Sequence, residues 1–390
     1  MIKDSNKYNY QSLLYLLLLL SGFLKGLTLF NIGYEIDLVK IAVGIAIFDI
    51  VIQLIRRRIH FSYSFAYLLG IIILFYSWMI FTSIYSPSEV YKYDKIFSFL
   101  ANIIFFFYPI FIKKINFNLL IKCYTIILLP LAIFLIYLRS ITWTGEIESP
   151  ELFIGNLFDY LSLGLHLGIL FLLLNHFNKN KWIQITVFAL LIASSARAPL
   201  LITVFLTLII NYKFILKFKF IKTIFNIKLI GFVVVLYLFF STQILPFFSN
   251  SHSRLISLFS SSDSSTSSRI DMFEYSFNQP FESLTTLFMG NGIGSFGIIY
   301  MGIDQRAYPH NIILETFFEL GFIGLFLGFL IILLILNNLN IKKNIFSLLL
   351  LFAFLNAMKS SNLTDLWILF SFIGASSIAN SKMQIYNSIK

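Results

Sequence analysis

The sequence predicts an all-α integral membrane protein with about twelve transmembrane helices. Hydrophobic residues make up 58% of the 390-residue chain, charged residues make up 12%, and the mean hydropathy is +0.85. Apolar runs that match, or nearly match, a bilayer core of about 30 Å recur along the chain. This composition excludes a soluble protein, and we expect residues 1–390 to form a single polytopic membrane domain.

The apolar runs predict the spans in order. They cover residues 10–30, 35–55, 61–84, 96–112, 123–138, 156–174, 182–196, 199–212, 224–245, 311–336, 345–358 and 365–380. Lysines precede the first run, but Lys25 interrupts it and no small-residue cleavage site follows. We therefore expect an uncleaved first span and not a signal peptide.

Lysine and arginine residues predict the orientation. Cytoplasmic loops carry an excess of these residues, and every second loop of this chain is basic, for example at Arg56–Arg58 and Lys342–Lys343. Both termini are therefore expected in the cytoplasm. The formal net charge of +11 follows from this topology and does not indicate a nucleic-acid partner. Asp49, inside the second span, is expected to pair with a basic residue that the sequence does not identify.

One large loop, residues 246–309, separates spans nine and ten and is predicted on the outer side. Ser268 and Asp271 form a capping-box pattern in it, with Arg269 between them. Apolar residues share one helical face after this pattern: Ile270, Phe273 and Phe277. We expect a short amphipathic helix on the outer membrane surface, with Arg269 in its first turn, where an anion would feel the charge and free N–H groups.

A glycine-rich turn, GNGIGSFG at Gly290–Gly297, follows this helix. It would let the backbone approach a ligand closely, or it is simply a turn before the next helix. No strand precedes it and no Gly-Lys-Ser/Thr follows, so it does not match a nucleotide phosphate loop.

Polar residues lead directly into the tenth span, in the stretch YPHNIILETFFEL. Pro309 cannot continue a helix and Asn311 is a suitable N-cap, so the helix should begin near Asn311, with His310 at its mouth. Asn311, Glu315 and Glu319 fall on one face, and Glu319 would lie about 12 Å deeper than Asn311. Carboxylates at that depth indicate a functional cavity or a buried partner. The alternative is a helix-end cluster that reaches back to the interface.

Spans seven and eight are short, at about 21–23 Å as helices. The turn SSARAPL between them should therefore be recessed, with Pro199 at the first position of the returning helix and Arg197 at the tip. An arginine there needs an anionic partner. The diphosphate of a lipid-linked substrate would fit its guanidinium; the alternatives are a structural ion pair with Glu315 or Glu319, or a side chain that reaches the interface.

These motifs together resemble the bacterial O-antigen ligase and O-antigen polymerase superfamily. His310 and Asn311, followed after nine residues by Gly321–Gly324, look like the family's His-Asn-x9-Gly-x-x-Gly signature. The sequence SSARAPLL around Arg197 is similar to the family's Ser-Arg turn, and Arg269 precedes a glycine-rich turn.

The resemblance covers roughly residues 155–336 and implies a GT-C-like membrane glycosyltransferase in the bacterial inner membrane, with its site facing the periplasm. A glycan on undecaprenyl diphosphate would pass to an acceptor hydroxyl. The implied partners are this lipid-linked oligosaccharide, the acceptor glycan, membrane lipids and a chain-length regulator. No cofactor is implied, and the sequence shows no His, Cys or carboxylate cluster at metal-ligand spacing.

The chemistry of such a transfer assigns roles to the candidate residues. Arg197 and Arg269 would bind the diphosphate and stabilise it as it leaves, and neutral His310 would position or deprotonate the acceptor hydroxyl. Glu315 would orient the histidine or the acceptor. Additional candidates are Asn311, Glu319, Arg306 and Arg254.

The acceptor divides the family. A polymerase uses another lipid-linked repeat unit, whereas a ligase uses the lipid A core sugar. We favour the polymerase because that branch is broader, although the His-Asn-x9-Gly spacing is often used to describe ligases. A flippase or secondary transporter is the alternative of another class, because such proteins also have about twelve spans, but no matching halves are seen.

Overall fold

The computed structural model describes residues 2–28, 38–56, 63–112, 115–143, 160–211, 264–337, 339–341 and 344–388. The regular elements in these ranges are helices, and none is a strand. The longer helices are α1 (Ile2–Thr28), α2 (Leu38–Arg56), α3 (Tyr63–Thr82), α4 (Tyr91–Phe107), α5 (Phe117–Trp143), α7 (Tyr160–His176), α8 (Lys181–Ala193), α9 (Arg197–Ile210), α14 (Ser264–Asn278), α17 (Ile312–Asn337), α18 (Ile345–Ser360) and α19 (Trp367–Ser388). The shorter ones are η1 (Tyr108–Phe111), η3 (Gln279–Glu282), α15 (Leu284–Met289) and α16 (Phe296–Met301).

Several described helices suit a membrane. Five are long and apolar enough to cross one: Leu38–Ile55, Phe65–Thr82, Tyr91–Phe111, Phe117–Leu138 and Ile312–Asn337. Shorter apolar helices lie at the other predicted spans that the structure describes. The prediction of an all-helical chain is confirmed for these ranges, and the long apolar helices are consistent with a membrane protein. The predicted span 224–245 lies outside the described residues.

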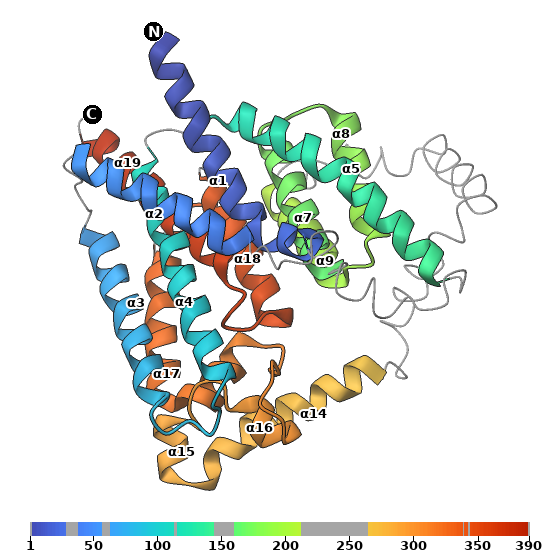
Figure 1. Ribbon diagram of the computed structural model, residues 1–390. Helices are drawn as coiled ribbons and strands as arrows, with labels where there is room; N and C mark the ends of the chain where they lie inside the picture. Colours follow the sequence, from blue (N-terminus) through green and yellow to red (C-terminus); the bar gives the residue numbers. More distant parts are fainter. Residues whose placement is uncertain are drawn as a thin grey trace. The chain divides into compact units, whose positions relative to one another are not determined.

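The chain divides into two compact units. The first draws on Met1–Lys25, Glu35–Leu120 and Ser264–Lys390, and the second on Gly26–Tyr34 and Ile121–Asp263. Within the first unit, Figure 1 shows α3, α4 and α17 side by side, with α15 and α16 at one end of α17. Within the second unit, α8 and α9 both pack on α7.

Loops that are far apart in sequence meet at this end of the first unit. The carboxylate of Asp304 accepts hydrogen bonds from the Ser88 hydroxyl at 2.7 Å and from the Glu89 N–H at 2.8 Å. Arg306 forms an ion pair with Asp365. The loops before α4, α17 and α19 therefore share one end, as the predicted alternation of spans requires.

The other helix ends of the first unit also meet. The Gln11 amide donates to the Phe111 carbonyl at 3.1 Å, and the ring of Phe346 contacts both Tyr15 and Phe117. The predicted basic segments follow or precede these positions in sequence.

A backbone break in α17 departs from the single straight helix that hydropathy predicts over 311–336. Gly321 has φ 64° and ψ −164°, which a residue with a side chain rarely adopts. The glycine-rich turn packs against this break: the Asn291 N–H donates to the Phe318 carbonyl at 3.0 Å, and the Gly292 N–H donates to the Glu319 carbonyl at 2.9 Å. The close approach of this turn is therefore to α17.

This contact requires glycine on both sides. A Cβ atom added to Gly290 would lie 2.4 Å from the Glu319 carbonyl oxygen, and one added to Gly321 would lie 2.4 Å from the Gly290 nitrogen. Both glycines also have positive φ.

We predict that Gly321→Ala lowers the free energy of unfolding by about 1–3 kcal/mol or more, because the new methyl group adds a steric clash to a strained backbone. Thermal unfolding in detergent measures this change. Gly70→Ala is the matched control, since an added Cβ there meets nothing within 4 Å. Equal melting temperatures for Gly321→Ala and Gly70→Ala would refute the prediction.

Candidate functional site

A buried lysine joins the two glutamates of α17. The ammonium group of Lys95, on α4, lies 2.5 Å from Glu315 Oε1 and 2.6 Å from Glu319 Oε1. All three side chains are fully buried. An ion pair removed from water is stable only where further hydrogen bonds satisfy the remaining oxygens, and here they do.

Backbone N–H groups satisfy the other two carboxylate oxygens. Leu363 N–H donates to Glu315 Oε2 at 2.9 Å, and Gly294 N–H donates to Glu319 Oε2 at 3.0 Å. The cluster of Lys95, Glu315 and Glu319, which we call the charge cluster, therefore connects four segments: α4, the first half of α17, the glycine-rich turn and the loop before α19.

The sequence predicts two of the three residues of this cluster. Glu315 and Glu319 do share one face and do have a buried partner, so that interpretation is confirmed; the alternative of side chains reaching the interface is wrong, because both are fully buried. The structural partner considered from sequence was Arg197, whereas the structure shows Lys95. A signal for it existed: Lys92 and Lys95 stand on the predicted outer side, against the general bias of the positive charges.

The partners of Asp49 also differ from the one that the sequence predicts. Its carboxylate accepts hydrogen bonds from the Gln53 amide at 2.7 Å and the Tyr108 hydroxyl at 3.2 Å. Neutral donors therefore stabilise this carboxylate where the sequence predicted a basic residue.

His310 lies at the mouth of α17, as predicted. The Asn311 side chain accepts from the Ile313 and Leu314 N–H groups at 2.9 and 3.2 Å, which confirms Asn311 as the N-cap. His310 itself has φ 56°, a left-handed conformation that is uncommon outside glycine and occurs often at functional sites. Its ring lies 4.5 Å from the ring of Tyr308, centroid to centroid.

His310 is a neutral imidazole at physiological pH. Burial, together with the positive charges of Arg269 and Arg306, lowers the pKa of His310 to about 4. Nδ1 of His310 is buried and accepts or donates no hydrogen bond among the described residues. A neutral imidazole can accept a proton, and a pKa near 4 makes it a weaker base than free imidazole.

Two arginines share the surroundings of His310. Arg306 pairs with Asp365 and stacks over the Tyr308 ring at 5.8 Å, so it is not simply a solvated loop charge. Arg269 is half-buried on α14 and acts electrostatically on the imidazole. The structure therefore brings together three of the residues selected from sequence: His310, Arg269 and Arg306.

The local setting of Arg269 corrects one prediction. α14 begins at Ser264, so Ser268 is inside the helix and the expected capping box at Ser268 and Asp271 is wrong. Arg269 lies in the second helical turn, away from the free N–H groups of the helix start. Any anion bound by Arg269 would therefore be held by its guanidinium and not by a helix terminus.

Arg197 belongs to the second unit and is described there. It is the first residue of α9, two residues after Ser195, whose φ is 60°. The sequence predicts Pro199 at the first position of α9, whereas the structure shows it as the third residue. The remaining candidate, Arg254, lies outside the described residues.

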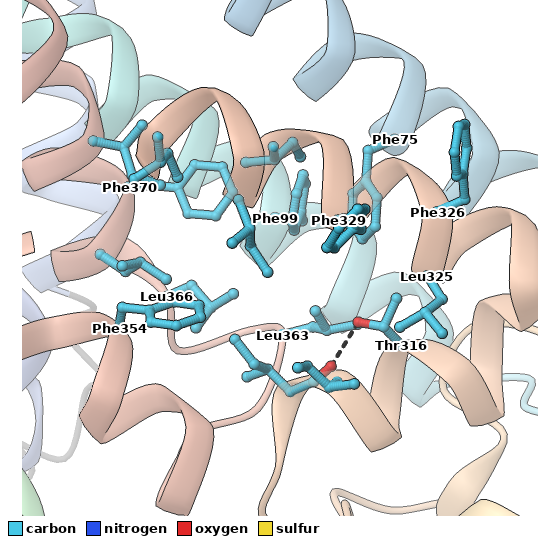
Figure 2. Close-up of a pocket in the computed structure, with 18 of the residues that line it drawn as sticks. Phe75, Phe99, Thr316, Leu325, Phe326, Phe329, Phe354, Leu363, Leu366 and Phe370 are labelled. Carbon is cyan, nitrogen blue, oxygen red and sulfur yellow. Dashed lines mark hydrogen bonds between the residues drawn. The ribbon is translucent and has the colours of Figure 1, made fainter. Parts of the chain in front are cut away.

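An apolar groove runs along α17 on both sides of the break at Gly321. Its volume is about 370 Å³, and Figure 2 shows a row of aromatic rings along it from Phe370 through Phe99 to Phe329 and Phe75. Thr316 is its polar lining residue, and the Thr316 hydroxyl donates to the Ile312 carbonyl at 2.6 Å. This groove offers a surface for hydrocarbon, and its lining includes Ile312 and Ile313, which follow His310 closely in sequence.

Among the described residues, no three or more His, Cys, Asp or Glu side chains are grouped so that they could hold a metal ion. Comparison of the chain with family models, curated proteins and solved structures finds no match.

We predict that Lys95→Met destabilises the first unit by about 3–5 kcal/mol, because it leaves two buried carboxylates without their cation. Urea or thermal unfolding in detergent would measure the loss. Lys92→Met, three residues earlier on α4 and half-buried, should cost far less.

A combined variant tests the reason for this loss. Adding Glu315→Gln and Glu319→Gln to Lys95→Met should restore most of the stability, since amides carry no charge and still accept from the Leu363 and Gly294 N–H groups. No recovery in the triple variant would mean that charge is not the cause.

Proposed function

We propose that this chain is a membrane glycosyltransferase that acts on a lipid-diphosphate-linked glycan, of the O-antigen polymerase kind. About twelve spans, a GT-C-like arrangement and a site facing the periplasm are part of this proposal. The observation that carries it is the setting of His310: a neutral imidazole with a buried, unused Nδ1, beside the charges of Arg269 and Arg306.

In the proposed transfer, the histidine and the arginine have separate roles. The acceptor hydroxyl oxygen attacks the anomeric carbon of the donor sugar, and its proton passes to the His310 imidazole. The bond from the anomeric carbon to the diphosphate oxygen breaks, and the lipid diphosphate leaves with the electron pair. Arg269 would stabilise the negative charge that develops on the diphosphate. The role of Arg197 in binding the diphosphate stays a prediction from the sequence.

Two further features support this assignment. All four oxygens of the charge-cluster glutamates already accept hydrogen bonds from Lys95, Leu363 or Gly294, which leaves the acceptor to His310 in this proposal. We therefore assign Glu315 a positioning role. The apolar groove beside α17 would accommodate the isoprenoid part of the substrate.

Complementation distinguishes the two acceptors. The gene would be introduced into one strain without its O-antigen polymerase and one without its ligase, both making the native glycan, and lipopolysaccharide would be separated on a gel. We expect a restored ladder in the polymerase strain. Restored attachment in the ligase strain alone would assign a ligase, and lipid-linked repeat units retained inside the cell without the protein would favour a flippase.

We predict that His310→Ala reduces transfer at least about 100-fold, because a positioned general base contributes roughly that factor or more. The measurement is glycan transfer by the purified protein with a lipid-diphosphate-linked substrate. His176→Ala is the matched control: His176 is half-buried at the end of α7 and belongs to the second unit. Near-normal transfer by His310→Ala would exclude the base role.

The pH dependence of transfer follows from the His310 pKa. Protonation removes the base, so the rate should fall only as the pH drops through about 4. Arg269→Gln removes one of the charges that lower this pKa, so the acid limb of the profile should move to higher pH. Arg269→Lys keeps the charge and should leave the limb in place; a limb that Arg269→Gln does not move would contradict this account.

A further inference from the structure

An exposed row of apolar side chains follows α14 into α15. The exposed fractions are 56% for Ile270, 53% for Phe277, 56% for Phe281, 76% for Leu284 and 50% for Phe288. Proteins in water rarely expose so many large apolar side chains in one continuous stretch. Glycosyl transfer at His310 does not use these residues, so they need an explanation of their own.

The residues of α14 are arranged in three stripes. One stripe packs on the protein, where Met272 and Tyr275 contact the core formed around Phe296 and Phe318. At 100° per residue, the second stripe is apolar: Ile270, Phe273 and Phe277. The third is polar and exposed: Asp271, Glu274 and Asn278. An apolar stripe beside a charged stripe is typical of a helix at the boundary between hydrocarbon and water. α14 has both of these stripes in addition to the one that packs on the protein.

The segment Gln279–Met289, which we call the elbow, forms one wall of a second apolar groove. This groove has a volume of about 620 Å³, and all of its lining residues are apolar, including Phe281 and Leu287 from the elbow and Leu314 and Phe322 from α17. The elbow also carries Glu282, which acts electrostatically on Tyr275 of the protein-facing stripe.

The groove continues the lipid-facing side of a membrane span. α17 is long and apolar enough to cross a membrane, and its phenylalanines Phe322, Phe326 and Phe329 are about half exposed, at 52%, 52% and 53%. Phe322 also lines the groove, and its ring contacts Phe288 of the elbow. The apolar surface therefore runs without interruption from the span to the elbow.

We propose that the elbow enters the hydrocarbon of the adjacent bilayer leaflet and that an acyl chain of a membrane phospholipid fills the groove between the elbow and α17. The outer loop, whose first helix the sequence predicts on the membrane surface, then also contains a segment that enters the membrane. This inference requires only that α17 spans the membrane, and it holds whichever reaction the protein catalyses.

Site-directed spin labelling tests the first part. The chain has one cysteine, so Cys123→Ser gives a background in which nitroxides can be attached singly at Phe281→Cys, Leu284→Cys or Phe288→Cys in phospholipid nanodiscs. Collision rates with oxygen, which concentrates in hydrocarbon, and with a water-soluble nickel chelate report the surroundings. Phe326→Cys is the lipid control and Asp271→Cys the aqueous control.

The elbow labels should match Phe326→Cys, with high oxygen and low nickel collision rates. Values that match Asp271→Cys at all three positions would overturn the proposal. Leu284→Cys is the most informative variant. Leu284 has the most exposed of the three labelled side chains, so its replacement should affect folding least.

The occupant of the groove needs a second readout. A nitroxide at Leu287→Cys would be examined by electron spin echo modulation, which detects deuterium nearby, with either acyl-deuterated phospholipid or D₂O. Modulation from the deuterated acyl chains and none from D₂O is the expected result. Modulation from D₂O alone, or from neither, would mean that water or the protein's own side chains fill the groove.

Discussion

The ammonium group of Lys95, held between Glu315 and Glu319, is the interaction on which the first unit depends. Three charged groups without exposure to water are costly unless each hydrogen-bonding position is used. Here both carboxylates use both oxygens, and two of the donors are backbone N–H groups from distant loops. The cost of burying the charges is thus offset only when α4, α17 and both loops are in place together.

The mouth of α17 follows from this constraint. The loop whose Leu363 N–H binds Glu315 continues to Asp365, which pairs with Arg306. Arg306 in turn lies over the ring of Tyr308, and Tyr308 contacts His310. A continuous set of contacts therefore connects the charge cluster to the imidazole, and it explains how His310 is held in a left-handed conformation that it would otherwise leave.

The same end of the unit faces two environments. The polar contacts around His310 need water or a polar substrate, whereas the elbow and the outer face of α17 are apolar. A substrate with a charged diphosphate and a hydrocarbon tail has both characters, which is why we propose lipid-linked glycan transfer over a reaction with a water-soluble donor. The buried glutamates, which the sequence marks as functional candidates, contribute here by holding the backbone.

Sequence reasoning reaches the local features of this site but not its long-range partners. Helical spacing identifies the shared face of Glu315 and Glu319, and capping rules identify Asn311, because both depend on neighbouring residues. Lys95 is 220 residues away from Glu315, and only the tertiary fold brings them together. Hydropathy does not predict the backbone break at Gly321 either, because the break accommodates the close approach of Gly290 from another loop.

Hydrogen exchange in the Lys95→Met variant, followed by mass spectrometry of peptides, tests the central claim most directly. The account predicts that peptides covering Gly290–Gly297 and residues 361–366 lose protection together, because their N–H groups bind the two carboxylates of one charge cluster. Peptides from α7, in the second unit, should keep their protection. Unchanged exchange in both loops, or a change in one loop alone, would contradict the claim that the cluster holds the site together.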